Sequence, residues 1–281
     1  MKKALTVSIV IPVYNEQHHL KACLDSITEQ SILPNEVIVV DNNSTDESIS
    51  IARSYPFVRV VKELQQGVMW GRNAGFDAAK YDLIGRIDAD TQLPNDWIKR
   101  LLTLFTTSDV AAVSGPVGWH DAPAKQIGLF IDKNVRRVTW RLGTKVDAVF
   151  LFGSNMAIRR DAWLSVRNEV CMRKDVHEDV DLAIHLYEHG FLVIFDPHLT
   201  AMTSSRRMND SLEQLKKYLA VYKNTYYVHG IKTTAVKLPT VLTLTTHFGV
   251  KLIKRGYNPE TGEFSIKRFV ESKPESRIHP M

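Results

Sequence analysis

Residues 83–90 read Leu-Ile-Gly-Arg-Ile-Asp-Ala-Asp, a mostly apolar run that predicts a buried strand ending in two carboxylates, one residue apart. Open α/β sheets bind ligands outside the carboxyl ends of their strands. Asp88 and Asp90 therefore indicate a site for a hard divalent cation such as Mg²⁺ or Mn²⁺, which usually carries a phosphate. The alternative is a solvated turn in which the aspartates only make local hydrogen bonds.

The residues before this stretch alternate between predicted strands and helices. A β-branched run at 5–13 predicts a first strand, and leucine and isoleucine recur after it at helical spacing. Strands follow at 36–40 and 58–61, with a capping box at 44–47 opening one helix and small residues at 71–79 forming another. This alternation predicts an α/β fold with a mostly parallel central sheet flanked by helices.

The second half of the chain is less regular, and its expected elements are more scattered. They are a helix after Pro94, a strand at 111–114, a helix and loops over a pocket at 118–145, strand pieces at 149–152 and 156–159, a helix after Asp179 and a later helix through Leu215.

Composition indicates an ordinary folded protein, since 44% of the 281 residues are hydrophobic and 24% are charged. Cys23 and Cys171 form neither a spaced pair nor a metal-ligand cluster in the sequence, which fits a reducing compartment. The apolar run after Met1 is broken by Pro12, so we expect no signal peptide. Residues 236–253 contain charges and a proline, so we expect no membrane-spanning segment either.

The net charge of +5 is unevenly placed, because residues 211–281 hold 12 Lys or Arg against 5 Glu. Residues 238–252 can form a helix with one apolar face and basic residues around it. Such a segment suits an anionic membrane surface or a phosphate-bearing acceptor, whereas the alternative is a solvated tail or a face packed on its own domain.

Polar and aromatic side chains follow the other predicted strands. Tyr14 can stack on a nucleobase or pack beside a helix start, and Asp41 can accept a hydrogen bond from a base or ribose or take part in capping. The glycines of 67–75 allow a ligand close to the backbone, and Arg72 supplies a planar cation suited to a diphosphate. This loop lacks the Gly-Lys-Ser/Thr of a P-loop.

Six ordered motifs together resemble the nucleotide-sugar-dependent, inverting glycosyltransferases of family 2, which have the GT-A fold, and the resemblance spans about residues 5–205. They are Val-Ser-Ile-Val-Ile-Pro-Val-Tyr-Asn-Glu at 7–16, Val-Ile-Val-Val-Asp-Asn-Asn-Ser-Thr-Asp at 37–46, Gly-Arg-Asn-Ala-Gly at 71–75, Asp-Ala-Asp at 88–90, Gly-Ser-Asn-Met-Ala-Ile-Arg-Arg at 153–160 and His-Glu-Asp-Val-Asp-Leu at 177–182.

The resemblance implies a role for each matching residue. Around the donor nucleotide it implies Pro12, Tyr14, Glu16, Asp41 and Arg72, with Asp88 toward the ribose or sugar and Asp90 as the chief ligand of Mn²⁺ or Mg²⁺. From the Glu178-Asp179 pair it implies Asp179 as the catalytic base, and it places Gly153, Ser154 and Asn155 in a turn beneath the acceptor.

Two departures from the family pattern qualify this reading. The histidine that relatives often carry some two dozen residues after the Glu-Asp pair is replaced by Thr-Ser-Ser-Arg-Arg at 203–207, so Arg206 or Arg207 is expected to supply charge to the diphosphate. The Gln-x-x-Arg-Trp signature of processive synthases is absent, which favours transfer of a single sugar, of the hexosyltransferase type, over polymer synthesis.

The sequence thus predicts a GT-A domain at 1–208, with a donor half to about 115 and an acceptor half from about 116, and a basic helical extension at 209–281. The expected partners are a UDP- or GDP-sugar and a glycan or lipid-linked acceptor of the cell envelope, with no nucleic acid. The expected location is the cytoplasm, with peripheral contact at the inner face of the membrane.

Two rival functions remain open. A non-catalytic sugar-nucleotide or glycan-binding protein would share the fold, and a sugar nucleotidyltransferase would share the acidic site. The second rival should carry a glycine-rich basic loop after the first strand, which residues 12–16 are not.

Overall fold

The computed structural model describes residues 4–122, 125–142, 150–231, 251, 255–258, 261 and 263–271. The apolar and basic segment expected at 238–252 lies outside these ranges apart from Lys251, so the predicted membrane-facing helix is not described. Within the described ranges, no helix is both long enough and apolar enough to cross a bilayer.

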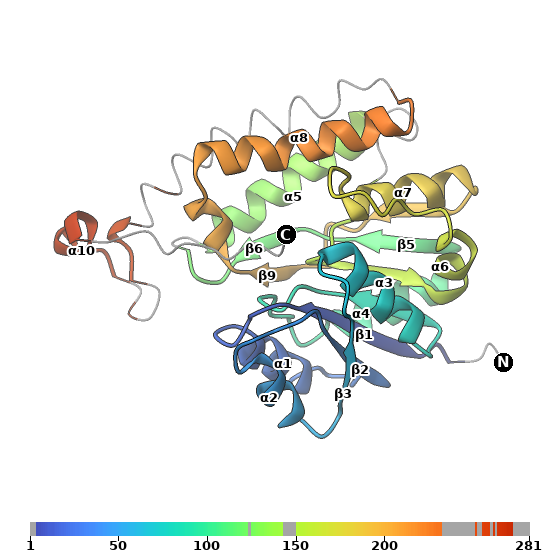
Figure 1. Ribbon diagram of the computed structural model, residues 1–281, viewed down its shortest axis with the longest axis horizontal. Helices are drawn as coiled ribbons and strands as arrows, with labels where there is room; N and C mark the ends of the chain where they lie inside the picture. Colours follow the sequence, from blue (N-terminus) through green and yellow to red (C-terminus); the bar gives the residue numbers. More distant parts are fainter. Residues whose placement is uncertain are drawn as a thin grey trace.

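A seven-stranded sheet in the order β3-β2-β1-β4-β7-β5-β8 forms the centre of the molecule (Figure 1). Its pairs are parallel except at β7, which runs antiparallel to both β4 and β5. A separate parallel pair joins β6 and β9. The strands are β1 (Val7–Val13), β2 (Glu36–Asp41), β3 (Val58–Lys62), β4 (Leu83–Arg86), β5 (Val110–Ser114), β6 (Val117–Trp119), β7 (Met156–Arg159), β8 (Leu192–Phe195) and β9 (Ala201–Thr203).

Helices cover both faces of this sheet, as the alternating pattern predicts. In Figure 1, α1 and α2 lie at the opposite end of the molecule from α8. The helices are α1 (Leu20–Thr28), α2 (Ser48–Arg53), α3 (Val68–Ala78), α4 (Trp97–Thr107), α5 (Lys125–Leu142), α6 (Arg160–Val166), α7 (Glu178–Glu188), the 3₁₀ helix η2 (Ser205–Asn209), α8 (Leu212–Val228) and α10 (Ile266–Glu271).

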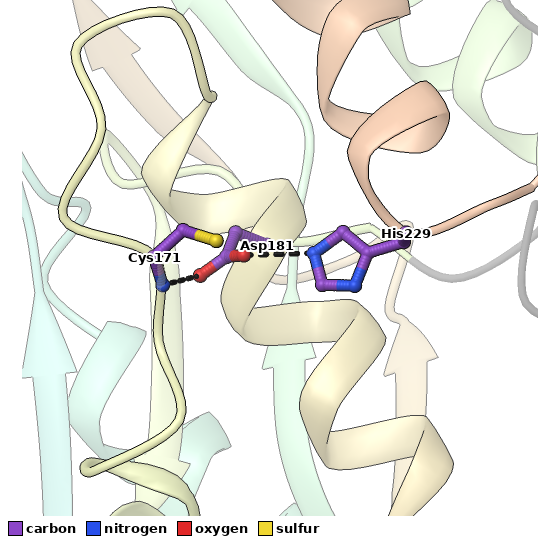
Figure 2. A group of neighbouring side chains, drawn as sticks. All are labelled: Cys171, Asp181 and His229. Atoms are coloured by element: carbon purple, nitrogen blue, oxygen red, sulfur yellow. Dashed lines mark hydrogen bonds and ion pairs between the residues drawn. The ribbon is translucent and has the colours of Figure 1, made fainter.

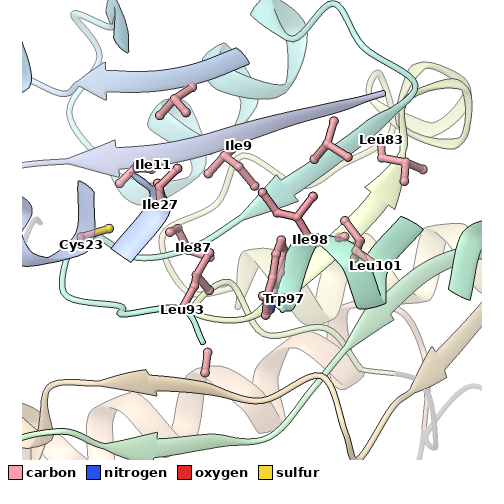
Figure 3. Close-up of a cluster of buried hydrophobic side chains, with 14 of the residues drawn as sticks. Ile9, Ile11, Cys23, Ile27, Leu83, Ile87, Leu93, Trp97, Ile98 and Leu101 are labelled. Carbon is pink, nitrogen blue, oxygen red and sulfur yellow. The ribbon is translucent and has the colours of Figure 1, made fainter. Parts of the chain in front are cut away.

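The two faces of the sheet carry separate hydrophobic cores because successive residues of a strand point to opposite sides. Ile9 and Ile11 of β1 belong to the core shared with α1 and α4, where Trp97 is almost completely buried (Figure 3). Val10 lies in the second core, which contains Phe76 of α3 and side chains of α6 and α7. The buried, β-branched composition of β1 and β2 follows from this two-sided covering.

The elements of the first half agree with the sequence-based expectation more closely than those of the second. The capping box expected at 44–47 is wrong: α2 begins at Ser48, whose backbone N–H and hydroxyl both donate to Asp46. The strand piece expected at 149–152 is not formed over 150–152, where the chain is irregular. Strands β6, β8 and β9 were not predicted: β6 and β9 have only three residues and so carry little periodicity, whereas β8 is the apolar run Leu-Val-Ile-Phe, a signal that was overlooked.

Helix α8 packs directly against the rest of the domain. Its Tyr226 shares a buried cluster with Val180 and Ile184 of α7, and the hydroxyl of Thr225 accepts a hydrogen bond from the backbone of His177 at 2.8 Å. The stretch from 212 to 231 is therefore part of the same packed unit as α7, although the sequence placed it in an extension.

Trp97 offers a test of the core, since its ring packs beside Gly85 and its indole N–H donates to the buried Asn155 side chain at 2.9 Å. Trp97→Phe should lower the free energy of unfolding by about 2–4 kcal/mol, because it removes ring volume and leaves a buried amide oxygen without its donor. Trp163→Phe is the matched control, since Trp163 donates to Asp77, whose side chain is 48% exposed and can be rehydrated. The free energies of unfolding are measured by urea titration. Equal decreases in Trp97→Phe and Trp163→Phe would contradict a special role for the hydrogen bond between Trp97 and Asn155.

Candidate active site

The carboxyl end of β4 and the amino-terminal turn of α7 bring four charged side chains together. Arg86 is the last residue of β4, and Asp88 follows in the next turn. Glu178 and Asp179 are the first two residues of α7, where the unpaired N–H groups of a helix favour negative charge. The segments are distant in sequence, and β7 between β4 and β5 connects the two parts of the sheet.

The guanidinium of Arg86 is the hub of this group. Its Nη1 donates to Asp179 Oδ2 at 2.9 Å, and its Nη2 lies 3.0 Å from Asp88 Oδ1 and 3.7 Å from Glu178 Oε1. Burial alone would lower the pKa of Arg86, but the Asp179, Asp88 and Glu178 carboxylates raise it above its ordinary value. Arg86 is 3% exposed, so it is a permanent buried cation whose charge is balanced by carboxylates.

Gly153 makes room for this arrangement. A Cβ built there would fall 0.5 Å from Arg86 Nη1, so any side chain at 153 would displace the guanidinium. The backbone N–H of Gly153 also donates to Asp179 Oδ2 at 2.6 Å. The glycine expected beneath the acceptor thus holds the predicted base and its arginine partner in position.

The second carboxylate oxygen of Asp179 is differently placed. Oδ1 is buried, makes no hydrogen bond to any residue that the structure describes, and lies 4.0 Å from Arg72 Nη1. Burial raises the pKa of Asp179 above its ordinary value, with Arg86 opposing and Glu178 adding to the rise. A carboxylate with one oxygen held and the other unbonded, and with a raised pKa, is suited to accept a proton.

The pKa of Glu178 is shifted in the opposite direction. Burial would raise its pKa too, but His177 together with Arg86 and Arg72 lowers it below the ordinary value. Its Oε2 lies 3.8 Å from His177 Nδ1. The pair therefore holds one carboxylate strongly ionised beside one with a higher proton affinity, an arrangement typical of acid–base sites.

Arg72 does not occupy the position expected of a diphosphate ligand. It is fully buried in α3, stacks near the Trp163 ring and donates from Nη1 to the backbone carbonyl of Glu178. Burial lowers its pKa. Its charge thus acts on the start of α7 and on Asp179, and direct contact with a phosphate does not fit this placement.

Asp90 and Arg206 form a second charged group next to the first. The Arg206 guanidinium binds both oxygens of Glu16 at 2.7 and 2.6 Å, and its Nε lies 3.0 Å from Asp90 Oδ2. Asp90 Oδ1 accepts from the Thr203 hydroxyl at 2.8 Å. Arg206 is thus in the site, as expected, but its charge is shared between two carboxylates.

The donor set of the Asp-Ala-Asp stretch fits a hard divalent cation. The Asp88 side chain is 41% exposed and pairs with Arg86 through Oδ1, so the carboxylate is open to a further ligand. Both oxygens of Asp90 already have partners, so its predicted role as chief ligand requires a cation to share them with Thr203 and Arg206. His120 also lies here, with Nε2 3.2 Å from the Asp90 carbonyl oxygen.

The remaining predicted donor residues lie where the strands end. Pro12, near the end of β1, and Tyr14 and Glu16, which follow this strand, are partly exposed, while Asp41 is buried and accepts from the backbone of Ser44 at 2.8 Å. The Arg207 guanidinium lies 4.0 Å from the centre of the Tyr218 ring of α8.

In the predicted acceptor turn, the Asn155 side chain is fully buried. It donates to the carbonyls of Pro116 and Leu199 and accepts from Trp97, so it stabilises the scaffold. Ser154 is partly exposed, and its role as an acceptor contact stays a prediction.

Sequence reasoning missed Arg86, although a signal was present. An arginine inside an otherwise apolar strand is almost never buried without a charged partner, and here it immediately precedes the two aspartates. His120 and Thr203 were also missed, because each reaches Asp90 from a short strand or turn that the sequence did not reveal.

Comparison with known proteins identifies the family and agrees with this fold. The family model described as glycosyl transferase family 2 matches residues 8–164, which is more than half of the chain. The chain therefore belongs to glycosyltransferase family 2. An undecaprenyl-phosphate 4-deoxy-4-formamido-L-arabinose transferase from Aeromonas hydrophila is 40% identical over 107 residues, which cover 34% of this chain and 32% of that protein. The chain likewise spans less than half the length of the first curated relatives that it matches.

Solved structures share the fold. The mannosyltransferase PcManGT from Pyrobaculum calidifontis, in complex with GDP-Man and Mn²⁺, superposes with a TM-score of 0.61 at 18% identity, over 90% of this chain and 72% of that one. Glucosyl-3-phosphoglycerate synthase from Mycobacterium tuberculosis, in complex with Mn²⁺, UDP-Glc and phosphoglyceric acid, gives 0.54 at 17% identity, over 82% and 81%. The expected GT-A-like architecture is thereby confirmed.

Arg86→Met tests the hub. It should lower the free energy of unfolding by about 3–5 kcal/mol near neutral pH, because it leaves buried carboxylates without their cation. Asp179 then has a folded-state pKa raised further above its unfolded value, so the folded state binds the extra proton. The difference in the free energy of unfolding between Arg86→Met and the unsubstituted protein should therefore shrink as the pH falls toward about 4, the ordinary pKa range of aspartate.

The matched control is Arg167→Met, which removes a pair with Asp77 in which both side chains are nearly half exposed. That change should cost less than about 1 kcal/mol at any pH in the range. Denaturant titrations at several pH values measure both variants. A deficit for Arg86→Met that does not change with pH would contradict the assignment.

Proposed function

We propose that this chain transfers a single sugar from a nucleoside diphosphate sugar to an acceptor hydroxyl with inversion at the anomeric carbon. The observation that carries the proposal is the geometry of Asp179: Oδ2 is held by Arg86 and Gly153, while the buried Oδ1 makes no hydrogen bond to a described residue. A single displacement needs such an oriented carboxylate to remove the proton of the attacking hydroxyl.

The reaction balances as one displacement. The acceptor oxygen forms a bond to the anomeric carbon, the bond from that carbon to the diphosphate oxygen breaks on the opposite face, and the hydroxyl proton passes to Asp179 Oδ1. Arg86 stabilises Asp179 as the anion before the transfer. The divalent cation that Asp88, with Asp90, would hold neutralises charge that grows on the departing diphosphate.

The donor is proposed to be UDP- or GDP-linked. Two solved structures of the same fold contain these nucleotides, GDP-Man in one and UDP-Glc in the other, each with Mn²⁺. In this chain the partly exposed Tyr14 and the Asp41 carboxylate, at the ends of β1 and β2, are the groups available to a base and ribose. The donor half is accordingly placed at about 1–115.

A lipid-linked or cell-envelope glycan acceptor is proposed on a different ground. The relative from Aeromonas hydrophila is named for transfer to undecaprenyl phosphate. The basic composition of residues 211–281 would suit an acceptor held at an anionic membrane from the cytoplasmic side. The acceptor half is proposed at about 116–208, and α8 of the basic extension packs through Tyr226 on Val180 and Ile184 of α7, the helix that carries the proposed base.

Asp179→Asn provides the main test. The substitution keeps the shape and the acceptance from Gly153 but removes the basic oxygen, so turnover should fall by about 10²–10⁴-fold. Binding of UDP or GDP with Mn²⁺, measured by calorimetry, should be unchanged. Product anomeric configuration, read by NMR from the wild-type reaction, should be opposite to that of the donor.

Two outcomes of this experiment favour the rival functions. Nucleotide binding without transfer or donor hydrolysis by the wild-type protein, across a panel of sugar nucleotides, would indicate a non-catalytic binding protein. Formation of a sugar nucleotide from a sugar phosphate and a nucleoside triphosphate would indicate a nucleotidyltransferase.

Asp88→Asn tests the cation site. Loss of the exposed carboxylate should raise the Mn²⁺ concentration for half-maximal turnover by at least about tenfold, because a charged oxygen ligand is replaced by a neutral one. Asp25→Asn, on the exposed face of α1 where the residue pairs with Lys21, is the control and should leave the Mn²⁺ dependence unchanged. Equal Mn²⁺ curves for the two variants would count against the assignment.

A further inference from the structure

A thiol, a carboxylate and an imidazole meet on the side of α7 that faces away from Asp179. Cys171 lies in the loop before α7, Asp181 lies in its first turn, and His229 follows the end of α8 (Figure 2). One ligand atom from each lies within 4.8 Å of the others. Asp181 and Asp179 are two residues apart, so their side chains project about 200° apart around the helix, and the cluster is separate from the active site.

Asp181 is the centre of the cluster and is completely buried. Its Oδ1 lies 2.8 Å from His229 Nε2, and its Oδ2 accepts from the backbone N–H of Cys171 at 2.9 Å. Cys171 is partly exposed, so an ion can reach the cluster from the surface.

A second imidazole strengthens the pattern. His185 lies one turn after Asp181, and its Nε2 is 3.6 Å from Asp181 Oδ1. Both of its ring nitrogens are buried without a hydrogen bond to any residue the structure describes. Glu169 and Glu188 lie 3.9 and 3.7 Å from its Nδ1, the position in which a carboxylate supports a metal-bound histidine.

The chemistry of this donor set selects among cations. Thiolate, imidazole and carboxylate together are the ligands of Zn²⁺, whereas Mg²⁺ and Ca²⁺ prefer oxygen alone. A thiolate and a carboxylate together carry two negative charges, so they balance the charge of a divalent ion. A neutral site of this kind suits a buried position. Zn²⁺ bonds of about 2.0–2.3 Å at tetrahedral angles put ligand atoms about 3.3–3.8 Å apart. A separation of 4.8 Å between ligand atoms of Cys171, Asp181 and His229 must therefore shorten by about 1 Å when the ion binds. Movement of the Cys171 and His229 side chains can supply this change.

We propose that Cys171 Sγ, an oxygen of Asp181 and Nε2 of His229 bind a structural Zn²⁺, with water as the fourth ligand and His185, whose Nε2 is 3.6 Å from Asp181 Oδ1, as a neighbouring imidazole. The ion joins the loop before α7, the first turn of α7 and the end of α8. It therefore fixes the helix whose first residues are Glu178 and Asp179. This site is independent of the donor chemistry, because none of its ligands contacts Arg86, Asp88 or Asp90 in any described interaction.

Cobalt substitution tests the proposal with a readout that turnover does not influence. Co²⁺ added to the metal-free full-length protein should give an intense thiolate-to-cobalt charge-transfer band in the near ultraviolet and visible bands of tetrahedral Co²⁺. One equivalent of Zn²⁺ should abolish both. Cys171→Ser should lose the charge-transfer band.

The matched control is Cys23→Ala. Cys23 is the only other cysteine, and its Sγ lies 3.7 Å from the Asp88 carbonyl oxygen, beside the proposed Mn²⁺ site. The band should persist in Cys23→Ala and in Asp88→Asn. A band that survives Cys171→Ser and disappears in Cys23→Ala would place the cobalt at the donor site and overturn the proposal.

Metal content and thermal unfolding give a second measurement. Protein dialysed against Zn²⁺ and then against buffer should retain about one equivalent per chain, and Zn²⁺ should raise its Tm. Asp181→Asn and His229→Gln should each lower Zn²⁺ affinity by at least about tenfold, as loss of a zinc ligand does. No retained Zn²⁺ and an unchanged Tm would show that the cluster is only a hydrogen-bonded network and would refute the site.

Discussion

The buried guanidinium of Arg86 is the interaction on which the rest of the site depends. It lies where β4 ends and contacts carboxylates from two segments distant in sequence, Asp88 on its own strand turn and Glu178 and Asp179 at the start of α7. Arg86, Glu178 and Asp179 are buried, and none of them would be tolerated alone, since an unpaired ion in a protein interior costs several kcal/mol. The carboxyl end of β4 and the start of α7 are thus held together by the need of these buried charges for partners of opposite sign.

The need to pair these buried charges explains how the other polar residues around Arg86 are placed. Position 153 requires glycine because the Arg86 guanidinium occupies the space that a side chain would fill. Arg72 is buried at the start of α7, where it donates to the Glu178 carbonyl. Arg206 performs the corresponding role for Asp90 and Glu16. Residues that a motif groups together as ligand contacts therefore separate into those that can face a ligand and those that fix the charges around it.

The sequence was a good guide where structure repeats locally and a poor one where it does not. Long β-branched runs and helical spacing located β1 and β2 with their helices, and the ordered motifs located Asp88 and Asp179. The buried position of Arg72, the partners of Arg86 and the approach of Cys171 to Asp181 and His229 depend on tertiary packing, which no local period encodes. The three-residue strands β6 and β9 are likewise too short for a periodic pattern, whereas the apolar run of β8 was a signal that was overlooked.

The antiparallel strand β7 affects the order in which the chain can fold as it is synthesised. Its Met156 pairs with Arg86 across the sheet, so β4 gains its second neighbour only after seventy or so further residues of chain have been made. Asp179 follows Arg86 by 93 residues, so the two side chains lack each other until the chain has grown well past β7, and closing so long a loop carries an entropic cost before any contact compensates it. The buried group of charges should therefore assemble in one late, cooperative step of folding, and a nascent chain that ends before α7 would carry Arg86 without the carboxylates of that helix.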